Sequence, residues 1–178
     1  MKKLVVVLVV SLMLVFAVGS VTLADMTVKA GYDLGGTMSS AGSSLNVDGG
    51  LALGFEYTSE MADNLMVGGG FEYQLNRKPA GSSSGFSFIP LYGLVQYKFD
   101  QFYVVGRLGY DLYNQEAAIP AGASISGGIY YGVGAGYSIN QNMVVEAIYG
   151  ISNASFSYMG ITQTASYSKL GLSFGYKF

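Results

Sequence analysis

The stretch from Leu65 to Asn76 reads LMVGGGFEYQLN, and its side chains separate by the parity of their positions. Odd positions carry Leu, Val, Gly, Phe, Tyr and Leu, whereas even positions carry Met, Gly, Gly, Glu, Gln and Asn. A period of two is the pattern of a β-strand with one apolar and one polar face. Helical spacing would bring Phe71 and Leu75 together but would mix Glu72 into their face, so the stretch predicts a strand.

Seven further segments alternate in the same way, and they cover residues 26–36, 47–58, 86–99, 102–114, 125–139, 143–153 and 167–178. The connections between segments alternate in length. The longer ones, mostly rich in Ser, Gly and Ala, are residues 38–45, 77–85, 115–124 and 154–164; residues 59–64 are intermediate, and 100–101 and 140–142 are tight. This layout predicts an all-β fold, an eight-stranded antiparallel up-and-down barrel with loops on one side and turns on the other.

The direction in which the apolar faces point separates a transmembrane barrel from a soluble one. Towards the short turns these faces carry aromatic side chains, as expected of a girdle at one membrane interface. The predicted girdle residues are Tyr57, Tyr97, Phe99, Phe102 and Tyr137. The opposite faces hold many glycines and few charges, unlike the solvent side of a soluble protein. We therefore predict a transmembrane barrel; a soluble secreted ligand-binding β-barrel, with the faces inverted, is an alternative.

Lone charged residues occur at mid-strand on the polar faces. They are Lys29, Glu56, Glu72, Lys98, Arg107, Glu146 and Lys169. A buried charge left without a partner costs several kcal/mol, so we expect these residues to form a salt-bridge network that, with the glycines, fills the lumen. A network that rearranges to open a narrow pore for small solutes is the alternative. Near the outer strand ends, surface solvation is the expectation for Asp33, Asp48 and Asp111.

The first 24 residues have the layout of a secretory signal peptide. Lys2 and Lys3 precede an apolar run over residues 4–18, and small residues Thr22 and Ala24 precede Asp25. We expect cleavage after Ala24 and a barrel formed by residues 25–178; an uncleaved membrane anchor is the alternative. Cleavage would remove two of nine basic residues and none of eleven acidic ones, leaving 7 − 11 = −4. With no basic patch, nucleic-acid binding is not expected.

The composition excludes most enzyme chemistry. The chain has no histidine and no cysteine, so it lacks the commonest general base, a thiolate nucleophile and the usual transition-metal ligands. We expect no catalytic residue, no metal and no cofactor. Recognition would fall to strand extensions or to loop tips such as residues 77–79 and 118–120.

The end of the chain carries a motif of a known family. Lys169 is followed by Gly171, Phe174, Tyr176 and the terminal Phe178, which resembles the C-terminal assembly signal of outer-membrane barrels. Residues 25–178 resemble the small eight-stranded outer-membrane proteins, the group of the OmpA transmembrane domain, OmpX and the opacity-like proteins.

This resemblance implies an outer-membrane location, with both mature termini in the periplasm and the protein monomeric. It also implies outer-membrane lipid and the barrel-assembly machinery as partners, while leaving any extracellular partner unspecified. Enzymes of similar topology use histidine, so the expected role is structural or surface-interacting and non-enzymatic.

Overall fold

The computed structural model describes residues 24–117, 119 and 122–178; apart from Ala24, the expected signal peptide lies outside them. These residues form nine β-strands. They are β1 (Ala24–Ser40), β2 (Ser43–Val47), β3 (Gly50–Ala62), β4 (Leu65–Gln74), β5 (Phe86–Phe99), β6 (Phe102–Gln115), β7 (Ala123–Ser138), β8 (Met143–Tyr158) and β9 (Ile161–Lys177). Within the described part of the chain, no helix has both the length and the apolar character needed to cross a membrane.

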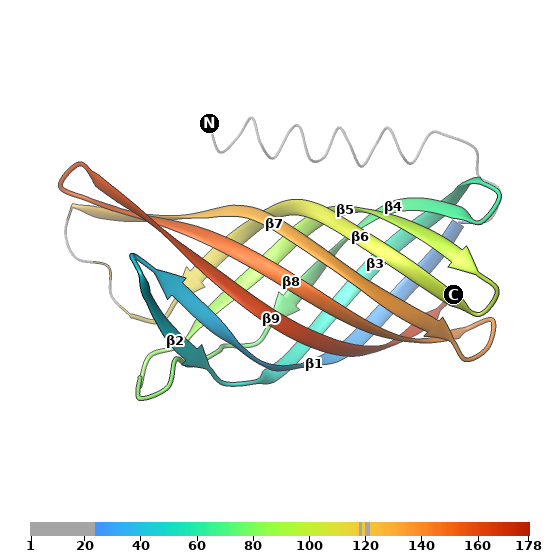
Figure 1. Cartoon of the computed structure of the whole chain (residues 1–178), viewed down its shortest axis with the longest axis horizontal. Coiled ribbons are helices and arrows are strands. Elements are labelled where there is room, and N and C mark those ends of the chain that lie inside the picture. Colours follow the sequence, from blue (N-terminus) through green and yellow to red (C-terminus); the bar gives the residue numbers. More distant parts are fainter. Residues whose placement is uncertain (1–23, 118, 120–121) are drawn as a thin grey trace.

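The strands close into a ring of eight (Figure 1). Each strand pairs antiparallel with its neighbours in the order β1-β3-β4-β5-β6-β7-β8-β9, and β9 pairs back onto β1. The short β2 adds no further position to the ring, because it pairs only with the outer part of β1, from Gly36↔Val47 to Ser40↔Ser43. The prediction of an eight-stranded up-and-down barrel is confirmed.

The two ends of the barrel differ (Figure 1). The first and last strands start and finish at one end, where the Phe178 N–H donates to the Met26 carbonyl at 2.9 Å; we call it the terminal end. The turns over residues 63–64, 100–101 and 139–142 also lie here. The opposite end, the loop end, carries the connection over residues 75–85, the end of β6, the start of β7 and two projecting hairpins.

These hairpins replace two of the expected loops. Residues 38–45 and 154–164 were predicted as loops, which is wrong: β1 continues to Ser40, and β8 and β9 are separated only by Met159 and Gly160. Both tips have positive φ at their two central residues, as in the two-residue turns that suit twisted hairpins (48° and 81° at Ala41 and Gly42, 49° and 80° at Met159 and Gly160). Ser and Thr residues continue the hydrogen-bonded ladder of these hairpins but give them no apolar face. The strand extensions therefore show no alternation of apolar and polar residues in the sequence.

Apolar side chains face outwards and charged ones inwards. On β6, Leu108 is 66% exposed while its neighbour Arg107 is 5% exposed. The same alternation leaves most large apolar residues of the other strands exposed on the outer wall. Exposed apolar side chains around a polar lumen are the arrangement of a transmembrane barrel, and they exclude the inverted faces of a soluble one.

A proline determines where the loop over residues 75–85 leaves the wall. Pairing between β4 and β5 runs from Leu65↔Tyr97 to Phe71↔Leu91 and does not include Pro90. Proline has no N–H to donate to a ladder, so pairing is weakened there. Beyond this point Arg77 and Phe86 exchange backbone hydrogen bonds of 2.7 and 2.9 Å, which holds the start of the loop over the barrel mouth.

Candidate functional site in the barrel lumen

Four charged side chains from four strands form a closed cycle nearer the terminal end, which we call the terminal quartet. Lys29 Nζ lies 2.6 Å from Glu56 Oε2 and 2.8 Å from Glu146 Oε1. Arg107 Nη2 lies 2.6 Å from the other oxygen of Glu56 and also pairs with Glu146. All four side chains are buried, and two cations alternate with two anions, so the formal charges cancel.

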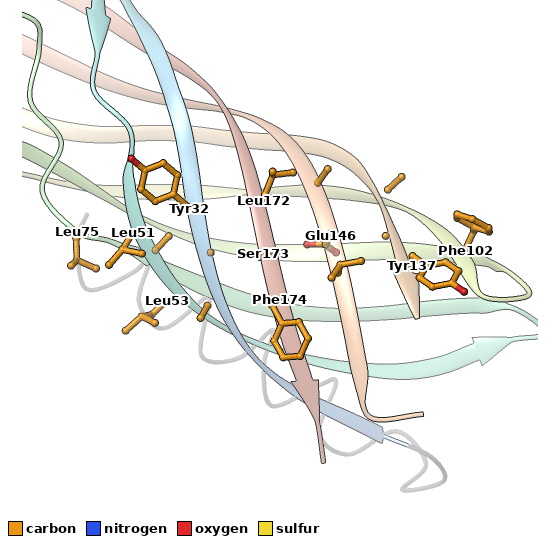
Figure 2. A pocket seen from close by; sticks show the side chains of 17 residues that line it. Tyr32, Leu51, Leu53, Leu75, Phe102, Tyr137, Glu146, Leu172, Ser173 and Phe174 are labelled. Atoms are coloured by element: carbon orange, nitrogen blue, oxygen red, sulfur yellow. The ribbon is translucent and has the colours of Figure 1, made fainter. Parts of the chain in front are cut away.

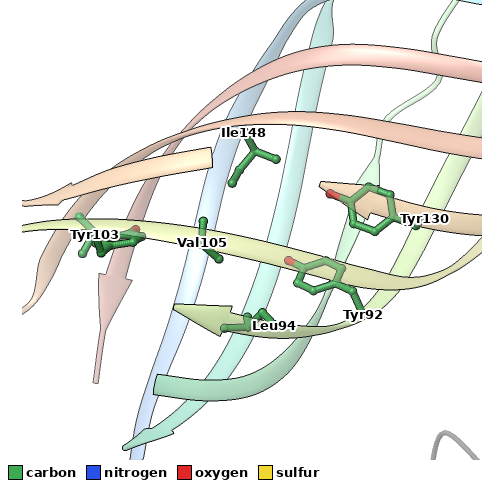
Figure 3. Close-up of a cluster of buried hydrophobic side chains, with 7 residues drawn as sticks. Tyr92, Leu94, Tyr103, Val105, Tyr130 and Ile148 are labelled. Carbon is green, nitrogen blue, oxygen red and sulfur yellow. The ribbon is translucent and has the colours of Figure 1, made fainter. Parts of the chain in front are cut away.

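Tyrosines complete the hydrogen bonding of the terminal quartet. The Tyr92 hydroxyl donates to Glu56 at 2.9 Å, and the Tyr103 hydroxyl donates to Glu146 at 3.1 Å. The Arg107 guanidinium lies 4.9 Å from the centre of the Tyr92 ring, within cation–π range. Figure 3 shows these tyrosines inside the barrel with their apolar neighbours, which form the cluster Tyr92, Leu94, Tyr103, Val105, Tyr130, Val144 and Ile148.

A second set of four charges, the loop quartet, lies nearer the loop end. Asp33 accepts from Arg77 Nη2 at 2.7 Å and from Lys169 Nζ at 3.0 Å, and Lys169 also lies 2.5 Å from Glu72 Oε1. Arg77 Nη2 donates in addition to the backbone carbonyls of Gly50 and Leu51, each at 2.9 Å. The formal charges of this quartet cancel as well.

The structure divides the expected single network into these two quartets. Six of its seven residues make ion pairs: Lys29, Glu56, Glu72, Arg107, Glu146 and Lys169. The seventh, Lys98, faces the terminal mouth of the lumen and makes no ion pair with another described residue. Between the quartets lie Tyr92 and Tyr130, with ring centres 5.6 Å apart.

Three residues belong to the lumen against expectation. Asp33 and Asp111 were predicted to be solvated, but they are 2% and 0% exposed, and Asp111 accepts from the Ser152 hydroxyl at 3.2 Å. Asp33 shares its parity with Lys29, so the alternation of its strand contained this signal. Arg77 was assigned to a loop tip, yet it is 1% exposed; because β4 ends before it, strand parity gives no guide there. Asp48 is exposed, as predicted.

Glycines on the inner wall leave the space that the long side chains occupy. A Cβ added to Gly136 would overlap the Tyr103 ring, and one added to Gly50 would lie 2.5 Å from Arg77 Nη1. A Cβ at Gly70 would lie 2.7 Å from Cγ of Glu56. Real Cβ contacts are not this short, so side chains at these positions would displace members of both quartets.

We expect Gly136→Val to destabilise the barrel by about 1–3 kcal/mol, the usual cost of overpacking, because the Tyr103 ring must turn away from Glu146. Urea unfolding of the protein in detergent micelles would measure this cost. Gly106→Val is the matched control: it lies on the outer wall of the same barrel, and a Cβ there meets nothing within 4 Å. Equal losses in both variants would contradict a spacing role for Gly136.

The lumen between these groups is nearly full. Two cavities among the described lumen residues have volumes of about 20 Å³ and about 10 Å³, and a single water needs about 10–15 Å³. At the loop end the lumen is covered by a cluster of Phe86, Phe88, Tyr167, Val47 and Ala154, with Tyr113 against it. The Phe88 and Tyr167 rings are stacked, with centres 6.1 Å apart.

A larger cavity, of about 920 Å³, is lined mostly by apolar side chains of the outer wall and also by inward-facing residues such as Glu146 (Figure 2). Its lining is mostly apolar and comes from several strands, with Tyr32, Leu51, Leu172 and Phe174 among the labelled residues. These side chains belong to the outer wall, so this groove is suited to apolar chains rather than to a polar substrate.

Aromatic side chains gather on the outer wall at the terminal end, where the predicted girdle residues lie. They pack in pairs, with ring centres 4.7 Å apart for Tyr97 and Phe99, 4.9 Å for Phe102 and Tyr137, and 5.1 Å for Tyr176 and Phe178. Tyr57 is half-buried on the same wall and makes none of these ring pairs.

A second group of outward aromatics, not anticipated from the sequence, lies nearer the loop end: Tyr32, Tyr73, Tyr110, Tyr131 and Tyr149. Along β6, Tyr110 follows Phe102 by eight residues. That spacing is about 26 Å of strand, or about 20 Å along the axis of a tilted barrel. An apolar wall between two aromatic bands, closed without a sheet edge, defines an integral membrane β-barrel.

Comparison with known proteins gives the family. The sequence model described as outer membrane protein beta-barrel domain matches residues 9–178, and the chain belongs to this family. The protein is therefore an integral outer-membrane β-barrel, and the resemblance to the small eight-stranded group is confirmed. No curated protein matches the chain.

Solved structures share the fold. Ail, the attachment invasion locus protein of Yersinia pestis, is 16% identical with a TM-score of 0.59, covering 88% of this chain and 100% of Ail. Neisserial surface protein A is 16% identical with a TM-score of 0.57, covering 88% of this chain and 100% of that protein. AlkL, in lipid bilayers, is 14% identical with a TM-score of 0.53, covering 90% of this chain and 92% of AlkL.

Proposed function

We propose that this protein is a non-enzymatic outer-membrane barrel with a structural or surface-interaction role, displaying the loop end outside the cell. The observation that carries the proposal is the filled lumen: two neutral quartets and an aromatic cover leave cavities of about 20 and 10 Å³. A barrel filled in this way has no continuous water path through its lumen. It serves instead as an anchor for the hairpins and loops at the loop end.

The terminal end would then face the periplasm, after cleavage of the signal peptide behind Ala24. Support comes from the short turns at that end, where β1 also starts and β9 also ends. Barrels of this class have short periplasmic turns and longer outer loops. We also propose that Gly171, Phe174, Tyr176 and Phe178 are read by the barrel-assembly machinery and that the protein is a monomer in outer-membrane lipid.

A non-enzymatic role is supported by the state of the carboxylates. In the quartets each acid accepts from a lysine or arginine, so none is free to act as a base. Among the residues that the structure describes, no group of three or more potential metal ligands occurs. Asp111, a buried acid on β6 outside the quartets, accepts hydrogen bonds from the Ser152 hydroxyl and the Asn153 N–H.

The loop end is nearly uncharged on its surface. Its exposed charges within the described residues are Asp48, Lys78 and Glu116. Ail has been solved in complex with the heparin analogue sucrose octasulfate, but a single exposed lysine would hold such a polyanion poorly here. We propose that contacts at this end use the hydroxyl-rich hairpins and their apolar tip, where Met159 and Ile161 are exposed.

We expect the protein to fractionate with the outer membrane and to change its mobility on SDS gels after boiling. A closed ring of hydrogen-bonded strands has no edge from which detergent can begin to unfold it, so unboiled protein should stay compact. A boiled aliquot of the same fraction is the control. Identical mobility before and after boiling, with the protein in the soluble fraction, would contradict the proposal.

The filled lumen also predicts electrical silence. Purified protein in planar bilayers should show no stepwise ion currents, because the quartets and the aromatic cover leave space for isolated waters only. Glu72→Ala and Arg107→Ala test whether the quartets act as a gate. Discrete conductance steps in either variant, absent from the parent protein, would favour the gated pore; silence in both would exclude it.

A further inference from the structure

The barrel wall is open between β6 and β7 at the loop end. The last pair that joins the two strands is Tyr110↔Ile129. They still touch just beyond it, because a Cβ on Gly127 would overlap the Asp111 carbonyl oxygen. At this level the register of β7 with β8 shifts between Gly127 and Tyr130, and such bulges bend a strand and end its pairing. Further out β6 stays paired with β5, whereas β7 continues beside the projecting hairpin of β8 and β9 (Figure 1).

The hydrogen-bond pattern shows which backbone groups of β7 face this opening. β8 and β9 are joined by a two-residue turn, so the flanking pair Tyr158↔Ile161 exchanges hydrogen bonds. Successive residues of a strand direct their backbone groups to opposite sides, so those of the next residue, Ser157, face its β7 partner Ser124. On β7 the N–H and C=O groups of Ser124 therefore face β8, and those of its neighbour Ile125 point into the opening.

This edge of β7 has neither a pairing strand nor the usual protection. The Gly127 carbonyl, which points the same way as that of Ile125, accepts from the Tyr110 hydroxyl at 2.8 Å. Within the part of the chain that the structure describes, the backbone groups of Ala123 and Ile125 join no ladder on this side. Exposed strand edges are normally blunted by lysine or proline, because they pair with other chains. Residues 123–127 read ASISG, so this edge carries neither.

The two faces of the projecting sheet differ in their side chains. On one face Ile125 lies opposite Phe156, and Tyr158 lies opposite Ile161. Ala154, of the same parity on β8, belongs to the aromatic cover of the lumen, so this apolar face lies above that cover. The other face carries hydroxyl groups, from Ser124, Ser126, Ser155, Ser157, Thr162 and Thr164.

We propose that the free edge of β7 binds an extended, uncharged peptide segment of a partner protein, which adds to the sheet as an antiparallel strand. An extended peptide is the ligand whose N–H and C=O groups match the spacing of an open ladder. Partner residues opposite Ala123 and Ile125 exchange hydrogen bonds with them and lie on the apolar face, so they are apolar, while the residues between are polar. Residues 117–145 and 147–168 contain no charged side chain, which favours an uncharged segment. This inference rests on the proposed surface role of the loop end.

A dye-labelled hexapeptide in which valine and threonine alternate tests the edge on the whole protein in uncharged detergent micelles. Its fluorescence anisotropy should rise with added protein beyond the rise in empty micelles. Methylation of the valine nitrogens should weaken binding at least about tenfold, because these N–H groups donate to β7. Methylation of the threonine nitrogens, which point away from β7, is the matched control and should leave binding unchanged. Equal effects of the two methylations would overturn the proposal.

Ile125→Pro removes the same hydrogen bond from the side of the protein. The lost N–H faces the opening rather than β8, so the β7–β8 ladder is retained and the mobility on SDS gels should still change on boiling. We expect at least about tenfold weaker peptide binding, whereas Ile125→Val keeps the N–H and should bind as the parent does. Unchanged binding by the folded proline variant contradicts strand addition. Self-association of the parent that Ile125→Pro abolishes assigns the edge to a second copy of this chain and also overturns the proposal.

Labelling of intact cells separates this inference from the surface role on which it rests. A membrane-impermeant amine reagent should modify the protein at Lys78, the exposed lysine of the loop end, and Lys78→Met should remove that label. If Lys78 is labelled but the purified protein binds no peptide, strand addition is wrong and the surface role stands. If Lys78 is not labelled, the surface role fails, and the inference fails with it.

Discussion

Arg107→Met is expected to destabilise the barrel by about 3–5 kcal/mol, the cost of removing one partner from a buried ion pair. Without the guanidinium, Glu56 and Glu146 remain buried and face only Lys29. Methionine retains much of the volume over Tyr92, so the loss reports charge rather than a cavity. Urea unfolding in micelles, followed by the mobility of unboiled samples, measures the change.

Restoring neutrality should recover part of this loss. Adding Glu146→Gln to Arg107→Met leaves one cation and one anion in the terminal quartet. We expect a coupling energy of about 1–3 kcal/mol between the two substitutions, as for contacting members of one network. Lys98→Met is the control inside the same lumen, because Lys98 makes no ion pair there, and it should have a much smaller effect. Strictly additive losses would contradict a closed cycle of charges.

Arg77→Met is expected to release the loop over residues 75–85 and to cost about 3–5 kcal/mol through the unpaired charge left on the loop quartet. The arginine joins Asp33 to the carbonyls of Gly50, Leu51 and Leu75, so its loss removes several hydrogen bonds at once. Limited proteolysis of the folded protein should detect faster cleavage within this loop, in addition to a lower urea midpoint.

The neighbouring residue provides the control for Arg77. Lys78 is exposed and contributes no ion pair to either quartet, so Lys78→Met should leave both the urea midpoint and the cleavage rate close to those of the parent. If the two variants are cleaved at the same rate, the buried arginine does not hold the loop.

Most of the correct predictions follow from whether a residue occupies an odd or an even position along its strand. This parity gave the ring of eight, the outward apolar wall and six of the charges in the quartets, because a side chain's face in a strand depends only on its position. The same rule applies to Asp33 and Asp111, for which the predicted solvation near the strand ends is wrong. Their burial follows from the extension of β1 and β6 beyond those residues.

Other features depend on contacts that a single strand does not contain. Arg77 lies outside β4, and its place in the lumen follows from the chain turning back over the mouth and pairing with Phe86. The division into two quartets depends on the stagger between neighbouring strands, as in Lys29↔Gly54 and Arg107↔Gly132. The hairpin tips were missed because Ser-rich strands have no apolar face to detect.

The origin of the quartet members in the chain has a consequence for insertion into the membrane. Each quartet combines three residues that precede β7 with one from the last two strands. Glu146 of β8 completes the terminal quartet, and Lys169 of β9 completes the loop quartet. A sheet formed by β1 to β7 alone would carry an excess positive charge at one level and an excess negative charge at the next. When β9 pairs with β1, the last open edge of the sheet is removed. By then Glu146 of β8 and Lys169 of β9 are in the sheet, so both quartets are neutral. Integration should therefore be an all-or-none event, in which partly inserted sheets do not accumulate.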